Sequence, residues 1–101
     1  MTIDQRVKDI VKEFKKNGIS ARPDSNGRFF LLSERSGCLA FFKKPLQVGT
    51  IFIHEGGAIR EPHWMLTARD DGMAEYLNYI LAPIADKYHV TIVKADGYDR
   101  R

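Results

Sequence analysis

The sequence predicts a single α+β domain, an antiparallel meander sheet with two helices in the order α-β-β-β-β-α-β. Two segments with apolar residues at helical spacing lie towards the two ends of the chain. Short segments with a period of two, separated by turn residues, lie between them. The 101 residues are 44% hydrophobic and 29% charged, which suits one modest core and excludes a disordered chain. We expect the domain to span residues 1–96 and residues 97–101 to be a flexible C-terminal tail.

The first predicted helix covers residues 3–17. Thr2 is placed to cap its first turn, with Gln5 three residues later to complete a capping box. Gly18 is placed to end the helix, because glycine adopts the left-handed backbone of a C-terminal cap at little cost. The apolar positions that form one stripe on this helix are Ile3, Val7, Ile10, Val11 and Phe14.

Four strands are predicted after this helix, because the apolar period changes from 3.6 to two. They are residues 19–22, 28–34, 38–43 and 50–54. The first two are separated by Pro23-Asp24-Ser25-Asn26-Gly27, a strong turn signal. Residues 55–67 are predicted to be a loop, since Gly56 and Gly57 open the segment and Pro62 interrupts it.

A second helix is predicted from Asp70 to Tyr88 and a last strand from His89 to Ala95. Asp70, Asp71 and Glu75 lie near the start of this helix, where the positive end of the helix dipole favours negatively charged side chains. Pro83 is expected to kink or divide it, because proline removes a helical hydrogen bond.

Both faces of the predicted sheet are apolar. In the second strand, Phe29 and Leu31 point to one side and Phe30 and Leu32 to the other. One interpretation places a helix on each face, with Trp64 and its loop filling the remainder. The other places both helices on one face, which leaves an exposed apolar surface of the kind that marks interaction sites. That surface would carry Phe30, Phe52 and one of Phe41 or Phe42, surrounded by Arg22, Arg28 and His54.

The leading functional hypothesis is therefore a small non-catalytic binding or regulatory protein, such as an accessory inhibitor or adaptor. Its expected partner is another protein, with a homodimer as one form of the complex. Aromatic residues dominate interface energetics. The expected partner-binding residues, from the second sheet face and the 55–66 loop, are Phe30, Phe52, His54, His63 and Trp64. Trp64 has a second interpretation as a core residue.

The chain is expected to be cytoplasmic, without cofactor, metal or membrane association. Its single cysteine, Cys38, cannot form an internal disulfide, and the N-terminus runs directly into a charged amphipathic segment. Its apolar runs are far shorter than the about twenty residues that a membrane-spanning helix needs.

Nucleic-acid binding is the first alternative, because the formal net charge is +3 and cations gather in the N-terminal part of the chain. The residues expected to contact phosphates are Lys8, Lys12, Lys15, Lys16, Arg22 and Arg28. The element order is similar to that of double-stranded-RNA-binding domains. However, the start of the second helix holds Arg69-Asp70-Asp71 where that family places a lysine cluster, so no family is assigned.

A small enzyme or a metal site is the second alternative. Two histidines and two carboxylates flank one loop, and these side chains serve both acid–base chemistry and metal binding. They are His54, Glu55, Glu61 and His63. Their spacing matches no catalytic or metal-binding motif, and we therefore expect no catalytic residue.

Overall fold

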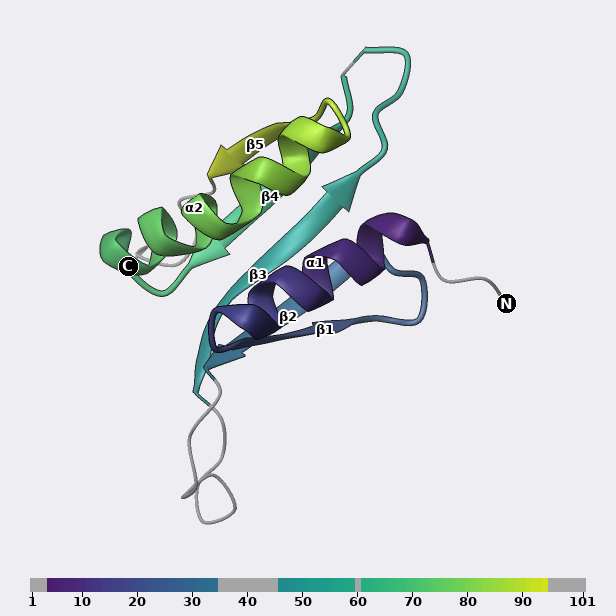
Figure 1. Cartoon of the computed structure of the whole chain (residues 1–101). Coiled ribbons are helices and arrows are strands. Elements are labelled where there is room, and N and C mark those ends of the chain that lie inside the picture. Colours follow the sequence, from purple (N-terminus) through teal and green to yellow (C-terminus); the bar gives the residue numbers. More distant parts are fainter. Residues whose placement is uncertain (1–3, 35–45, 60, 95–101) are drawn as a thin grey trace.

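The computed structural model describes residues 4–34, 46–59 and 61–94. They form two helices and a five-stranded, mostly antiparallel sheet, which confirms the predicted α+β class and element order (Figure 1). The elements are α1 (Gln5–Lys16), β1 (Ile19–Pro23), β2 (Phe29–Glu34), β3 (Gln47–His54), β4 (His63–Ala68), α2 (Asp71–Lys87) and β5 (Thr91–Lys94).

The strands lie in the sheet in their sequence order, β1-β2-β3-β4-β5. The first four form an antiparallel meander, and β5 pairs parallel to β4. Helix α2 makes the crossover between β4 and β5, because two parallel neighbours cannot be joined by a tight hairpin. A register shift between Leu32 and Ser33 interrupts the pairing of β2 with β3.

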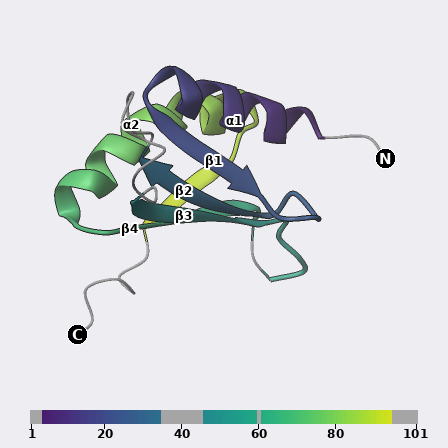
Figure 2. The same cartoon turned by 90° about the horizontal axis from the view of Figure 1, so that it is seen from below.

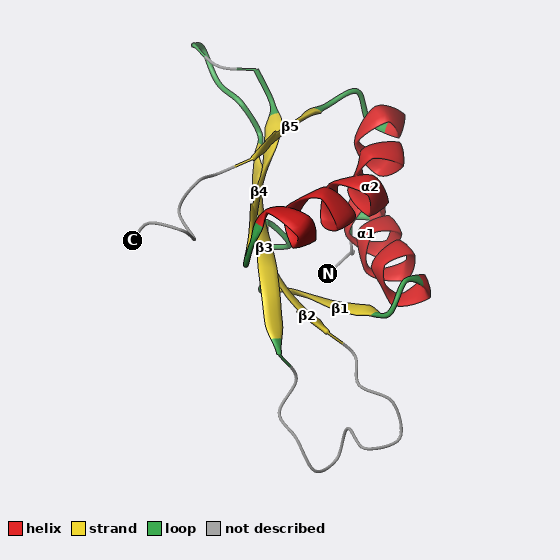
Figure 3. Cartoon of the chain, turned by 90° about the vertical axis from the view of Figure 1, so that its left-hand side faces the viewer, coloured by secondary structure: helices red, strands yellow, loops and turns green. Residues whose placement is uncertain are grey.

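Both helices cover the same face of the sheet. Seen along its edge, the sheet has α1 and α2 on one side (Figure 3). Helix α1 packs on β1 and against α2, whereas α2 packs on β3, β4 and β5. The helices bury an apolar stripe each, centred on Ile10 and Phe14 in α1 and on Leu77 and Leu81 in α2. The core therefore lies between the two helices and one side of the sheet.

The helix ends follow local chemistry. Asp4 is the N-cap of α1, where its side chain accepts a hydrogen bond from the backbone N–H of Arg6, so the predicted cap at Thr2 is wrong. Asp70 caps α2 in the same way, through the backbone N–H of Met73. The chain leaves α1 through Gly18, whose φ of +81° fits the predicted role of this glycine.

Two predictions about the later elements need correction. The predicted loop over residues 55–67 is wrong at its end, where β4 begins at His63. In this strand, buried side chains that face the helices alternate with less buried neighbours from Trp64 to Ala68. Helix α2 continues through Pro83, so of the two expected effects of this proline the division of the helix is wrong. The predicted strand 38–43 lies outside the described residues. Within the described part of the chain, neither helix is long and apolar enough to cross a membrane.

Candidate functional site: the open face of the sheet

The side of the sheet opposite α1 and α2 is called the open face. Side chains alternate between the two sides of a strand, so its members follow from the register of the buried residues on the helix side. Its central and flanking strand residues are Ser20, Arg22, Phe29, Leu31, Thr50, Phe52, His54, His63, Met65, Thr67, Thr91 and Val93.

Aromatic rings form a continuous row across three strands of the open face. Phe29 on β2 pairs with Phe52 on β3, with ring centroids 6.4 Å apart. The Phe52 ring meets His54 edge to face at 4.6 Å. His54 in turn stacks on its cross-strand partner His63 of β4, at 4.5 Å and 15° between the ring planes. The geometry is that of favourable aromatic pairs, and it orders four rings into one surface.

This row remains accessible at its phenylalanine end. Phe29 is 38% exposed and Phe52 is 39% exposed, although both lie inside paired strands. Val93 of β5 has a similar exposure, and Met65 lies between Phe52 and Val93 in the register. The apolar surface therefore extends from β2 to β5.

Permanent charge is confined to the rim. Among the described strand residues of the open face, only Arg22 on the edge strand β1 carries one. At the end of β3, the Glu55 carboxylate accepts hydrogen bonds from the Arg6 guanidinium, and Arg28 lies 4.0 Å from it. The Arg6 hydrogen bonds lower the pKa of the Glu55 carboxyl and also that of Asp4. These ion pairs hold the start of α1 against the sheet end.

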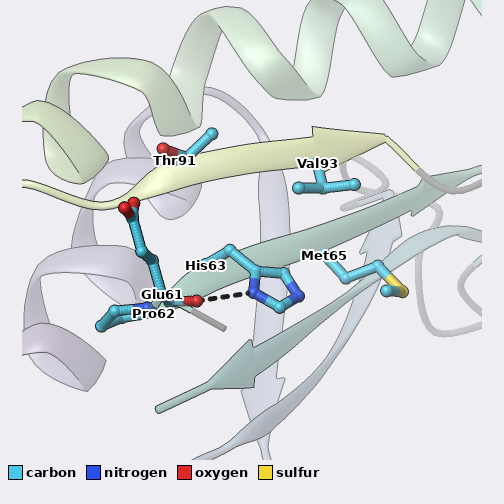
Figure 4. A pocket seen from close by; sticks show the side chains of 6 residues that line it. All are labelled: Glu61, Pro62, His63, Met65, Thr91 and Val93. Carbon is cyan, nitrogen blue, oxygen red and sulfur yellow. Dashed lines mark hydrogen bonds between the residues drawn. The ribbon is translucent and has the colours of Figure 1, made fainter. Parts of the chain in front are cut away.

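A hollow of about 460 Å³ opens on the open face beside β4 and β5 (Figure 4). His63 lies in its wall, with Nδ1 3.1 Å from the backbone carbonyl oxygen of Glu61. Because a carbonyl oxygen can only accept, Nδ1 carries the proton in this bond. The residues that line the hollow are Glu61, Pro62, His63, Met65, Thr91 and Val93.

The expected partner-binding residues divide between the two sides of the sheet. Phe52, His54 and His63 lie on the open face, as described above. Phe30 and Trp64 are fully buried on the helix side, so neither can contact a partner. Phe30 pairs with Ile51 and Trp64 with Ile53, and these two neighbours also belong to the core. Trp64 is therefore a core residue, as its second interpretation predicted. The exposed position expected for Phe30 is wrong.

The cations of the nucleic-acid hypothesis are not next to the aromatic row. Lys8, Lys12, Lys15 and Lys16 are exposed on α1, on the other side of the sheet. Arg22 lies at the β1 edge of the open face, and Arg28 is drawn towards Glu55. The sheet therefore lies between the aromatic row, on which bases would stack, and the four α1 lysines that were expected to contact phosphates.

The residues proposed for acid–base or metal chemistry do not form one cluster. His54 and His63 stack as cross-strand partners, whereas the Glu55 side chain pairs with Arg6. Among the described residues, no group of three or more histidine, cysteine or acidic side chains is placed to hold a metal ion.

Sequence reasoning missed three members of the apolar surface, namely Phe29, Met65 and Val93. Phe29 was separable from Phe30 by alternation, but alternation alone does not tell which side the helices cover. Met65 was hidden because its strand was taken for a loop.

In comparisons with known proteins, no family model, no curated protein and no solved structure matches this chain.

Proposed function

We propose that this chain is a non-catalytic binding protein that associates with a second copy of itself through the open face of its sheet. The observation that carries the proposal is the row of aromatic rings, exposed at Phe29 and Phe52, on the side that both helices leave uncovered. Contiguous exposed apolar side chains with a polar rim are typical of interaction surfaces on small soluble domains.

The charge distribution supports a second copy as the occupant. A two-fold symmetric interface brings each surface against itself, so a charged face would repel its own copy. Among the described strand residues of the open face there is one permanent charge, at its Arg22 edge, and the centre holds phenylalanine, methionine and histidine. Protein interfaces are depleted of charge at their centre and enriched in these aromatic and methionine side chains.

A nucleic-acid partner fits this face less well. Single-stranded nucleic acid requires cations beside the rings on which its bases stack. The lysines of α1 lie on the opposite side of the molecule from Phe29 and Phe52. A phosphate backbone that follows the aromatic row would therefore meet few positive charges.

Burial of the two phenylalanines supplies a useful part of the association energy. At about 40% exposure, each leaves about 80 Å² accessible, and its burial contributes about 2 kcal/mol at about 25 cal/mol per Å². A symmetric interface contains each ring twice. Loss of Phe52 from both copies should thus weaken the dimer by about 4 kcal/mol, which is about a thousandfold in Kd.

The direct test is sedimentation of the wild-type chain and of Phe52→Thr at micromolar concentrations. We expect a dimer for the wild type and a folded monomer for the variant, because threonine keeps the strand propensity but removes the ring. Tyr79→Gln is the matched control, since Tyr79 is 74% exposed on α2, away from the open face.

The control variant should sediment like the wild type, and circular dichroism should show that both variants are folded. A wild-type chain that is monomeric over the whole concentration range overturns the proposal. A dimer that Phe52→Thr leaves unchanged overturns it too, because another surface then makes the contact.

A further inference from the structure

The loop that joins β3 to β4 carries an apolar side chain that its own chain leaves bare. Ile59 of this loop is 96% exposed, more than any other large apolar side chain in the described part of the chain. The described parts of the loop project away from the helices, on the side of the open face (Figure 2). Ile59 is therefore presented to whatever lies against that face.

The hollow beside β4 and β5 lies at the same end of the sheet as this loop. Strand β4 begins at His63, directly after the loop, and Pro62 of the loop lines the hollow. Met65 and Val93 supply the other apolar parts of its wall. Its volume of about 460 Å³ exceeds that of any single aliphatic side chain. The exposure of Ile59 shows that this residue does not fill the hollow of its own chain.

The loop and the hollow are arranged so that two copies of the chain can exchange them. In a two-fold symmetric contact, a residue of one copy that meets a surface of the second copy is matched by the reverse contact. The loop and the hollow share one side and one end of the sheet. A two-fold axis through this end therefore places each loop over the hollow of the other copy.

We propose that Ile59 of each copy inserts into the hollow between β4 and β5 of a second copy. Its side chain would lie against Met65 and Val93, and the His63 ring would form part of the same wall. The inference rests on the proposed dimer and deepens it, because it fixes which end of the open face lies on the symmetry axis.

A second copy fits the hollow better than other occupants. Of its lining residues only Glu61 carries a permanent charge, and burial of a charged ligand against Pro62, Met65 and Val93 would be costly. An apolar side chain of a different protein would fill the hollow but would leave Ile59 in water. The symmetric exchange removes both apolar surfaces from water at once.

The direct experiment is NMR spectroscopy of a dimer mixed from two differently labelled wild-type samples. One sample carries isotopic label only in its isoleucine methyl groups, and the other only in its methionine and valine methyl groups. The samples are mixed at a concentration at which sedimentation shows a dimer. We expect nuclear Overhauser effects between Ile59 and the methyl groups of Met65 and Val93. Because the labels are on different chains, these signals must cross the interface, and they should vanish on dilution to the monomer.

Matched variants measure the contribution of the inserted side chain. Ile59→Ser should weaken the dimer about a hundredfold, because two isoleucine side chains leave their pockets, and should leave the fold intact. Leu46→Ser is the control, since Leu46 is 52% exposed but precedes β3, at the opposite end of the sheet from the loop. It should leave the Kd unchanged.

A double variant tests whether Ile59 and the hollow act on each other. Ile59→Ser combined with Val93→Ala should weaken the dimer by less than the product of the two separate effects, because both changes remove the same contact. Sedimentation of the two single variants and the double variant gives the three Kd values.

The outcomes separate this inference from the proposed dimer. A dimer that Phe52→Thr disrupts but Ile59→Ser leaves unchanged overturns the insertion and keeps the open face as the interface. The same conclusion follows if that dimer shows no cross-chain signals from Ile59, or if Leu46→Ser weakens it as much as Ile59→Ser does. A wild-type chain that stays monomeric overturns both proposals.

Discussion

The two faces of the sheet are built from the same strands, yet they differ in what covers them. On the helix side, large apolar residues such as Phe30, Ile51 and Leu66 are almost completely buried under α1 and α2. On the open face, Phe29 and Phe52 occupy neighbouring positions in the same strands and keep more than a third of their surface accessible. The difference teaches that helix placement, and not strand hydrophobicity, decides which rings become core.

The adjacent residues Phe29 and Phe30 offer the strongest test of this comparison. Phe30→Ala leaves a cavity between sheet and helices and should cost about 3–5 kcal/mol of unfolding free energy. Phe29→Ala removes a ring that is already 38% exposed and leaves no closed cavity, so it should cost about 2 kcal/mol, less than Phe30→Ala. Urea unfolding at low protein concentration, where any dimer has dissociated, measures both values. Equal losses for the two variants would mean that both faces are covered.

Glycine substitutions probe the closeness of packing on the helix side. A methyl group at Gly49 would overlap the backbone carbonyl oxygen of Thr67 and approach Leu77 Cδ1 to 2.9 Å. Gly49→Ala should therefore destabilise the chain by about 2–3 kcal/mol, because the backbone of β4 must move.

Gly57→Ala is the control for this change, since a methyl group at Gly57 meets nothing within 4 Å. It should change the stability by less than about 1 kcal/mol, in the stabilising direction, because alanine restricts the unfolded chain. Thermal unfolding of both variants gives the comparison. If Gly49→Ala is as mild as Gly57→Ala, β3, β4 and α2 are less closely packed than described.

Much of the fold follows from the sequence because periodicity is a local property. Both helices, the β1–β2 hairpin and the overall element order were predicted from spacing and turn residues. Strand β4 was missed, because Pro62 and the preceding glycines suggested a loop, and because the consecutive apolar residues Trp64, Met65 and Leu66 hide the period of two. Register with β3 and β5 shows this segment to be a strand, and register is not local.

The candidate site was predicted only in part. Alternation separates Phe29 from Phe30, but only the positions of α1 and α2 decide which of the two is exposed. The expected anchor Trp64 is buried for the same reason. His54 and His63 are brought together by the β3–β4 register, which the sequence could not supply once that strand was taken for a loop.

The contact between the two helices makes a smaller, pH-dependent contribution on the helix side. Asp9 of α1 accepts hydrogen bonds from the Tyr88 hydroxyl, the Lys87 ammonium and the Gln5 amide, which lower its pKa to about 2. The folded carboxyl thus binds a proton less readily than the unfolded one, whose ordinary value is 3.8. Its stabilising effect is complete above about pH 4 and is lost as the pH falls through about 2.

Asp9→Asn should therefore unfold at lower urea than the wild type at neutral pH, and this difference should shrink between about pH 4 and about pH 2. A constant gap for Asp9→Asn over this range would contradict the expectation. It would mean that the carboxylate is not held by α2, and that apolar packing alone fixes α1 beside α2 on the covered face.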